Sequence, residues 1–207
     1  MALSYFTTSH WIALLSGLPS AGTYLNTSSL RTLSGLSEKA VRQACWRLSK
    51  TGLLRRAGSG WYVNSFRSAA LEEIGCLLVR PSYISLDWVL AATGATTQPC
   101  HVLTCVTTKP TVKKDTLFGS IEYRSLSENL FWGFRQRRSA AGVIIREAEP
   151  EKALLDLVHL SCRTREPIWL DIDFARLDRQ KLAAYRARFP ATVQRALARL
   201  HQERSAA

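Results

Sequence analysis

The stretch that most constrains the fold is residues 36–63, where a two-faced helical pattern runs into a short glycine-rich turn. At 100° per residue, small apolar side chains fall on one arc and long polar or aromatic side chains on the opposite arc. Ser37 is suited to cap this helix and Gly52 to end it. The apolar arc holds Val41, Ala44, Cys45 and Leu48, and the polar arc holds Lys39, Arg42, Gln43, Trp46, Arg47 and Lys50.

The neighbouring segments complete a familiar order of elements. Thr8 or Ser9 can cap a first helix, and Thr27 can cap a short second helix. After the third helix, two short alternating segments flank the turn at residues 57–60, as in a β-hairpin. Helix, short helix, longer helix and hairpin in this order predict a winged helix-turn-helix over residues 1–66.

A winged helix offers the polar face of its third helix to the major groove of DNA, while the apolar face packs in the core. Arg42 and Gln43 are the expected base readers, because Arg and Gln make bidentate contacts to guanine and adenine. Winged helices also serve as protein-binding modules, and Trp46 can instead pack on the hairpin or a neighbouring domain. The predicted DNA-contacting residues are Ser37, Lys39, Arg42, Gln43, Trp46, Arg47, Lys50, Arg55, Arg56, Ser59 and Gly60.

Charge favours the same partner. The chain has a formal net charge of +12, and its first 65 residues hold seven basic side chains and one acidic one. Such an imbalance indicates a polyanion, nucleic acid before membrane, although solubility alone can also explain it. No apolar run reaches the length of a membrane span, and five irregularly spaced cysteines do not resemble a disulfide framework. We therefore expect a cytoplasmic protein with no membrane partner.

Residues 75–207 predict a second domain of mixed α+β type that ends in helices, so the whole chain is predicted to be α+β. Strand patterns cover residues 101–107 and 142–147, and residues 113–125 read as a hairpin. Ser85 is a candidate cap for an amphipathic helix.

A further helix is predicted to start at Pro150, which suits the first helical position. Leucines and Val158 cover most of its girth, so it should be largely buried. Lys152, Asp156 and His159 are expected on its polar strip.

Catalytic and metal motifs are weak. Asp171 and Asp173 have the D-x-D spacing of a magnesium site, but no phosphate-gripping glycine-serine turn precedes them, so helix capping at Asp173 and Asp178 is favoured. Cys100 and its neighbours lack the second ligand pair of a structural zinc site. No P-loop, nucleophile elbow or dinucleotide fingerprint is present. We predict no enzyme, no metal and no cofactor.

A second basic region stands beside the aromatic residues Phe131, Trp132 and Phe134. It can extend a nucleic-acid surface, with stacking on single strands as one variant, or it can be a solvated loop. Its residues are Lys113, Lys114, Arg135, Arg137 and Arg138.

Several motifs resemble the AbiEi-type antitoxin family of type IV abortive-infection toxin–antitoxin systems. They are PSYISLDWVLAATG (81–94), VTTKPT (106–111), FGSIEYRSL (118–126), LFWGF (130–134) and EPEKALLDLVHL (149–160), and they occur in the family's order after a predicted winged helix. The resemblance covers roughly residues 20–200.

The resemblance implies a repressor that binds double-stranded DNA upstream of its own gene. It also implies an antitoxin in phage defence, countering a cognate nucleotidyltransferase toxin. The family's recognition-helix role falls on Lys39, Arg42, Gln43 and Arg47, and the PEKALLD helix looks like family core. The chain is short for the family, so a stand-alone, ligand-sensing winged-helix regulator is the alternative.

Overall fold

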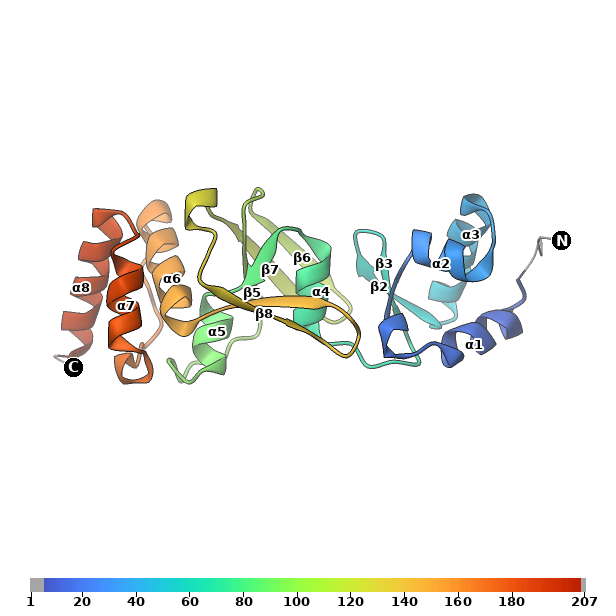
Figure 1. The fold of residues 1–207 in the computed structure, drawn as a ribbon, viewed down its shortest axis with the longest axis horizontal. Helices are drawn as coiled ribbons and strands as arrows, with labels where there is room; N and C mark the ends of the chain where they lie inside the picture. Colours follow the sequence, from blue (N-terminus) through green and yellow to red (C-terminus); the bar gives the residue numbers. More distant parts are fainter. Residues whose placement is uncertain (1–5, 206–207) are drawn as a thin grey trace.

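The computed structural model describes residues 6–205, and it is an α+β protein built from two units placed end to end (Figure 1). We call residues 6–66 the N-terminal unit and residues 71–205 the C-terminal unit. A three-stranded sheet, in the order β1-β3-β2, belongs to the first. A six-stranded sheet, in the order β6-β7-β5-β4-β9-β8, belongs to the second.

The N-terminal unit has three helices, a 3₁₀ turn and a hairpin. Ser37 caps the third helix as predicted, but the caps of the first two are Thr7 and Asn26, just before the predicted residues. In both cases the earlier side chain accepts a hydrogen bond from the backbone N–H three residues on. The elements are α1 (Thr8–Gly17), η1 (Ser20–Gly22), β1 (Tyr24–Asn26), α2 (Thr27–Ser34), α3 (Glu38–Lys50), β2 (Leu54–Gly58) and β3 (Trp61–Asn64).

The C-terminal unit begins with a helix on the sheet and ends with three helices stacked at the end far from the N-terminal unit (Figure 1). Its elements are α4 (Leu71–Leu78), β4 (Ser82–Ile84), α5 (Asp87–Ala92), β5 (Leu103–Thr107), β6 (Val112–Thr116), β7 (Gly119–Ser125), η2 (Glu128–Leu130), β8 (Phe134–Arg138), β9 (Ile144–Ala148), α6 (Pro150–Thr164), η3 (Phe174–Arg176), α7 (Arg179–Arg186) and α8 (Ala191–Ser205).

The predicted hairpin over residues 113–125 is confirmed as the antiparallel pair β6–β7. Residue 75, the predicted start of the second domain, falls inside the buried helix α4. Two short strands were not predicted, β4 at Ser82–Ile84 and β8 at Phe134–Arg138. The prediction missed β8 because it is an edge strand whose residues after Phe134 are all exposed, so it lacks apolar alternation.

The largest departure from expectation is the polar strip of α6, where Lys152 and Asp156 are buried and His159 is half-buried. Neither Lys152 nor Asp156 exposes any of its side chain, and the two form an ion pair four residues apart. Asp156 Oδ2 also accepts hydrogen bonds from the Tyr83 hydroxyl at 2.7 Å and the Ser85 hydroxyl at 2.9 Å. Ser85 therefore does not cap α5, as its sequence position suggested, because its hydroxyl ties β4 to α6.

Aromatic rings enclose the lysine. The Lys152 Nζ lies 5.2 Å from the ring centroids of Tyr83 and Trp132 and 5.3 Å from that of Phe189. Burial raises the pKa of the Asp156 carboxyl and lowers that of the Lys152 ammonium, while attraction between the two opposes both shifts. Helix α6 is thus joined to the sheet through a charged contact as well as through its leucines.

The two units share one apolar cluster. Tyr24, Ala57 and Val63 of the N-terminal unit pack in the core of the C-terminal unit, and the Tyr24 hydroxyl donates to the Glu73 carboxylate of α4. A separate core, centred on Trp11 and Leu30, holds the three N-terminal helices together. None of the helices in residues 6–205 combines the length and hydropathy of a membrane span.

Candidate nucleic-acid interface

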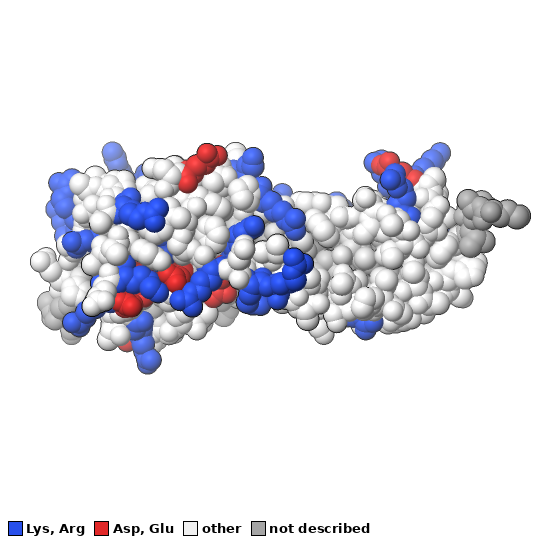
Figure 2. Space-filling model, viewed as in Figure 1, with Lys and Arg blue, Asp and Glu red and all other residues white. Residues whose placement is uncertain are grey.

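Helix α3 carries the two faces that its sequence predicted. Its apolar arc is buried, with Val41, Ala44, Cys45 and Leu48 each at 3% exposure or less. These small side chains let α3 lie close to α2 and β2. All six residues of its polar arc are exposed: Lys39, Arg42, Gln43, Trp46, Arg47 and Lys50. In Figure 2 this helix holds most of the charge on the visible face of the N-terminal unit.

The expected base reader Arg42 is engaged by the acid one turn before it. Its Nη2 lies 2.5 Å from Glu38 Oε1, and both side chains are more than half exposed. An exposed pair at this spacing contributes only about 0.3–0.5 kcal/mol to stability. Arg42 can therefore exchange Glu38 for a base edge at a small cost.

Trp46 is 66% exposed, so it does not pack on the hairpin or the second unit as the sequence had suggested. The Lys50 ammonium lies 5.9 Å from its ring centroid, at the outer limit of a cation–π contact. A large exposed aromatic side chain between basic residues is suited to contact a ligand surface. Ser37, at the start of the same helix, is exposed and accepts a hydrogen bond from the Ala40 N–H at 3.3 Å.

The β2–β3 hairpin was predicted to contact DNA beside α3, but its position differs from that prediction. Its tip points toward the C-terminal unit (Figure 1), and a Cβ on Gly58 would lie 3.5 Å from the Leu78 side chain. The Arg55 guanidinium lies 4.7 Å from the Phe118 ring centroid in the β6–β7 hairpin. Arg55 therefore contacts the C-terminal unit at the junction between the two units. Arg56, Ser59 and Gly60 remain exposed on the hairpin.

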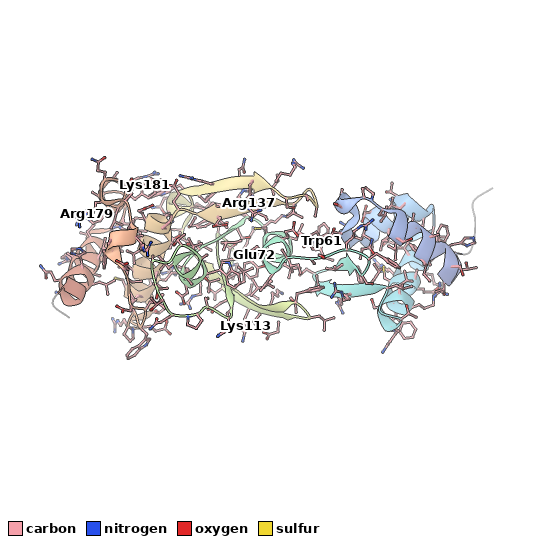
Figure 3. The ribbon with its side chains drawn as sticks, turned by 90° about the horizontal axis from the view of Figure 1, so that it is seen from below. Trp61, Glu72, Lys113, Arg137, Arg179 and Lys181 are labelled. Atoms are coloured by element: carbon pink, nitrogen blue, oxygen red, sulfur yellow. The ribbon has the colours of Figure 1, made fainter. Side chains whose placement is uncertain are left out.

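The second predicted basic patch is not one surface. Lys113 and Lys114 lie on β6, Arg135 to Arg138 lie on β8, and these strands form opposite edges of the six-stranded sheet. Figure 3 shows Lys113 and Arg137 on opposite sides of the C-terminal unit. The sequence analysis grouped these residues because all of them are basic. Their separation depends on the order of strands in the sheet, which the sequence does not reveal.

On the β8 edge, Arg135 forms an ion pair with Glu149, a residue that the sequence analysis had not assigned to any site. Glu149 accepts from Arg135 Nε at 2.9 Å, Lys181 Nζ at 3.3 Å and the Tyr185 hydroxyl at 2.5 Å. Burial alone would raise the pKa of Glu149, but these hydrogen bonds lower it below its usual value. The hydrogen bond to Glu149 raises the pKa of Tyr185 to about 12.

The other β8 arginines have no such acid partner. Arg138 Nη1 donates to the backbone oxygen of Gly142 at 3.2 Å, and Arg137 forms no ion pair with any side chain that the structure describes. The positive charge still offered by this edge is therefore that of Arg137 and Arg138. In Figure 2 basic side chains gather on this part of the C-terminal unit.

Within the D-x-D pair, Asp173 caps the 3₁₀ helix η3. Asp173 Oδ1 accepts from the Ala175 N–H at 2.9 Å, and Asp178 accepts from the N–H groups of Gln180 and Lys181, as the capping prediction required. Within residues 6–205, no three His, Cys, Asp or Glu side chains converge in the manner of a metal site.

Comparison with known proteins adds no further constraint, since no protein-family model matches the chain and a search of curated proteins found no match.

Proposed function

We propose that this protein binds double-stranded DNA through the N-terminal unit, as a winged helix, and represses transcription from its own promoter. One observation carries the proposal: α3 exposes four basic side chains, a glutamine and a tryptophan, while its opposite arc is buried in a three-helix core. Basic side chains supply electrostatic affinity for phosphates, and Arg and Gln supply base readout. Autoregulation is drawn from the resemblance to AbiEi-type antitoxins.

Fluorescence anisotropy on the DNA upstream of the gene, against a scrambled duplex of the same length, tests this proposal. Tighter binding to the upstream DNA, weakening steeply with salt, is the expected result. Equal, weak binding to both duplexes contradicts a repressor and directs the search to protein or RNA partners of α3.

Two variants separate base readout from phosphate contact. Arg42→Ala should weaken binding to the specific site by about 1–3 kcal/mol and leave binding to the scrambled duplex nearly unchanged. Lys50→Ala, the matched control on the same face, should weaken both duplexes alike. Equal losses on both duplexes for Arg42→Ala contradict its assignment as a base reader.

The antitoxin role is a separate proposal that rests on the resemblance alone. We propose that the C-terminal unit is needed to counter a nucleotidyltransferase toxin encoded beside this gene. Co-expression with that neighbouring gene should restore growth. Failure of rescue by full-length protein that still binds its operator rejects the antitoxin role and leaves the repressor proposal intact.

A further inference from the structure

A cleft of about 580 Å³ lies at the junction of the two units. Its volume is in the range of small-ligand pockets. Tyr24 and Trp61 of the N-terminal unit line one side, and the end of α4 and the turn between β8 and β9 line the other. In Figure 1 this turn reaches toward the N-terminal unit. A ligand held here would touch both units.

The charged side chains that line the cleft are Arg80 and Arg146, and no acidic side chain is among its lining residues. Arg80 is exposed and Arg146 is half-buried. Neither forms an ion pair with any carboxylate that the structure describes, and Arg80 Nε donates only to the Cys76 backbone oxygen, at 3.4 Å. The cleft therefore holds positive charge that the protein does not neutralise.

Acidic residues do occur beyond the Tyr24 side of the cleft. Glu73 is buried there, where it accepts hydrogen bonds from the Tyr24 hydroxyl and the Ala70 N–H. Glu72 acts on the same hydroxyl through its charge, and neither glutamate lines the cleft. The Glu73 carboxylate is thus engaged by the Tyr24 hydroxyl and the Ala70 N–H.

The Cys76 thiol also lines the cleft and feels the charge of its basic groups. Burial raises the pKa of Cys76, while the positive charges of Arg146, Arg80 and Arg137 lower it. The charges of these three arginines therefore act on the same thiol, and Arg80 and Arg146 are the two that line the cleft. Figure 2 shows basic side chains gathered where the C-terminal unit adjoins the N-terminal unit.

Trp61 adds a planar apolar surface. It is half-buried, packs against the shared core, and lies at the junction in Figure 3. Paired guanidinium groups suit a phosphate, and an indole suits a flat aromatic ring. We infer that the junction cleft binds a nucleoside monophosphate, with Arg80 and Arg146 on its phosphate and Trp61 against its base. This site is separate from α3 and does not depend on the proposed DNA binding.

Isothermal titration calorimetry of the full chain, without DNA and at about 0.15 M salt, tests the inference. The probes are AMP, GMP, CMP and UMP, with adenosine and inorganic phosphate as half-ligands. At least one monophosphate should bind saturably, with a dissociation constant below about 1 mM. The half-ligands should bind roughly ten-fold or more weakly, because each reaches only one part of the cleft.

The variant Arg80→Ala/Arg146→Ala should weaken nucleotide binding at least roughly ten-fold, since charge-assisted bidentate contacts are lost. Arg179→Ala/Arg195→Ala is the matched control, because it removes the same charge from exposed positions on α7 and α8. Figure 3 shows Arg179 at the far end of the C-terminal unit. Arg80→Ala alone, at an exposed position, gives a test in which folding is not at stake.

Either of two results would overturn the inference. None of the four nucleotides binds, or the cleft variant and the control bind them equally well. If no nucleotide binds, anisotropy with the upstream duplex gives the reason: loss of duplex affinity in the cleft variant but not in the control assigns the arginines to a DNA contact. The calorimetry contains no DNA, so its failure leaves the repressor proposal untouched.

Discussion

Two helices of this chain carry an ion pair at the same spacing and place it in opposite surroundings. On α3, Glu38 and Arg42 are four residues apart, with 58% and 71% of their side chains exposed. On α6, Lys152 and Asp156 are also four residues apart, and neither side chain is exposed. Spacing fixes that the two members of a pair face one another. It does not fix whether other elements cover them.

The difference in burial gives the two pairs different consequences. The α3 pair is surrounded by water, contributes little to stability, and leaves Arg42 able to change partners. The α6 pair cannot be separated without leaving a buried charge, and its Asp156 accepts hydrogen bonds from the hydroxyls of Tyr83 in β4 and Ser85 just after it. One pair is suited to binding and the other to fixing the fold.

The strongest way to break this comparison is Asp156→Ala. It should lower the free energy of unfolding by about 3–5 kcal/mol, because Lys152 would keep a buried charge without its partner. Urea denaturation measures the change, and Glu38→Ala is the matched control on α3. A loss of less than about 1 kcal/mol for Asp156→Ala would show that the buried pair behaves like an exposed one.

A second substitution, at Gly133, would place a methyl group against the buried Lys152 side chain. A Cβ on Gly133 would lie 2.9 Å from Lys152 Cγ, and Gly133 has a φ of +75°, where L-residues are strained. Gly133→Ala should lower the free energy of unfolding by about 1–3 kcal/mol. Gly35→Ala is the control, because Gly35 has a φ of +69° with no atom within 4 Å of its Cβ position. Equal losses would show that backbone strain alone matters and that Lys152 can move aside.

His159, the third residue of the α6 strip, makes stability depend on pH. Burial, with the positive charges of Arg163 and Lys152, lowers the pKa of His159. The unfolded chain therefore binds more protons as pH falls below about 6.5, so the free energy of unfolding should decrease on acidification. His159→Gln should make this decrease shallower in urea denaturation at pH 7 and pH 5. His101→Gln, at an exposed position, is the control, and the same slope in all three proteins would show that the partial burial of His159 does not affect stability.

The smallest effect on stability is expected for Glu38→Gln, which removes the exposed partner of Arg42. The free energy of unfolding should change by no more than about 0.5 kcal/mol. If α3 binds DNA, affinity for both specific and scrambled duplexes should rise, since one negative charge leaves the interface. A large loss of stability would show that the exposed pair has a structural role.

Local signals in the sequence were sufficient for much of the fold. The two arcs of α3, the first helical position of Pro150, the capping role of Asp178 and the hairpin over residues 113–125 all rest on contacts within a few residues. Each was predicted and is confirmed. The predicted exposure of the polar face of α3 is confirmed as well, while its contact with DNA stays a prediction.

Signals that depend on distant residues failed. Ser85 looked like a helix cap, but Asp156, 71 residues later, takes its hydroxyl. Lys113 and Arg137 looked like one patch and lie at opposite edges of the sheet. Trp46 looked like a packing residue and is exposed, since the hairpin turns toward the C-terminal unit.

The sequence by itself determined the two faces of α3, the caps at Ser37 and Asp178 and the charge imbalance, because these depend on neighbours along the chain. Only the tertiary structure decided which polar side chains of the C-terminal unit are buried. The order of strands placed Lys152 and Asp156 under Tyr83 and Ser85, and the junction of the units brought Arg80 and Arg146 to one cleft. Burial depends on which elements cover a surface, and the spacing of residues along the chain does not predict this.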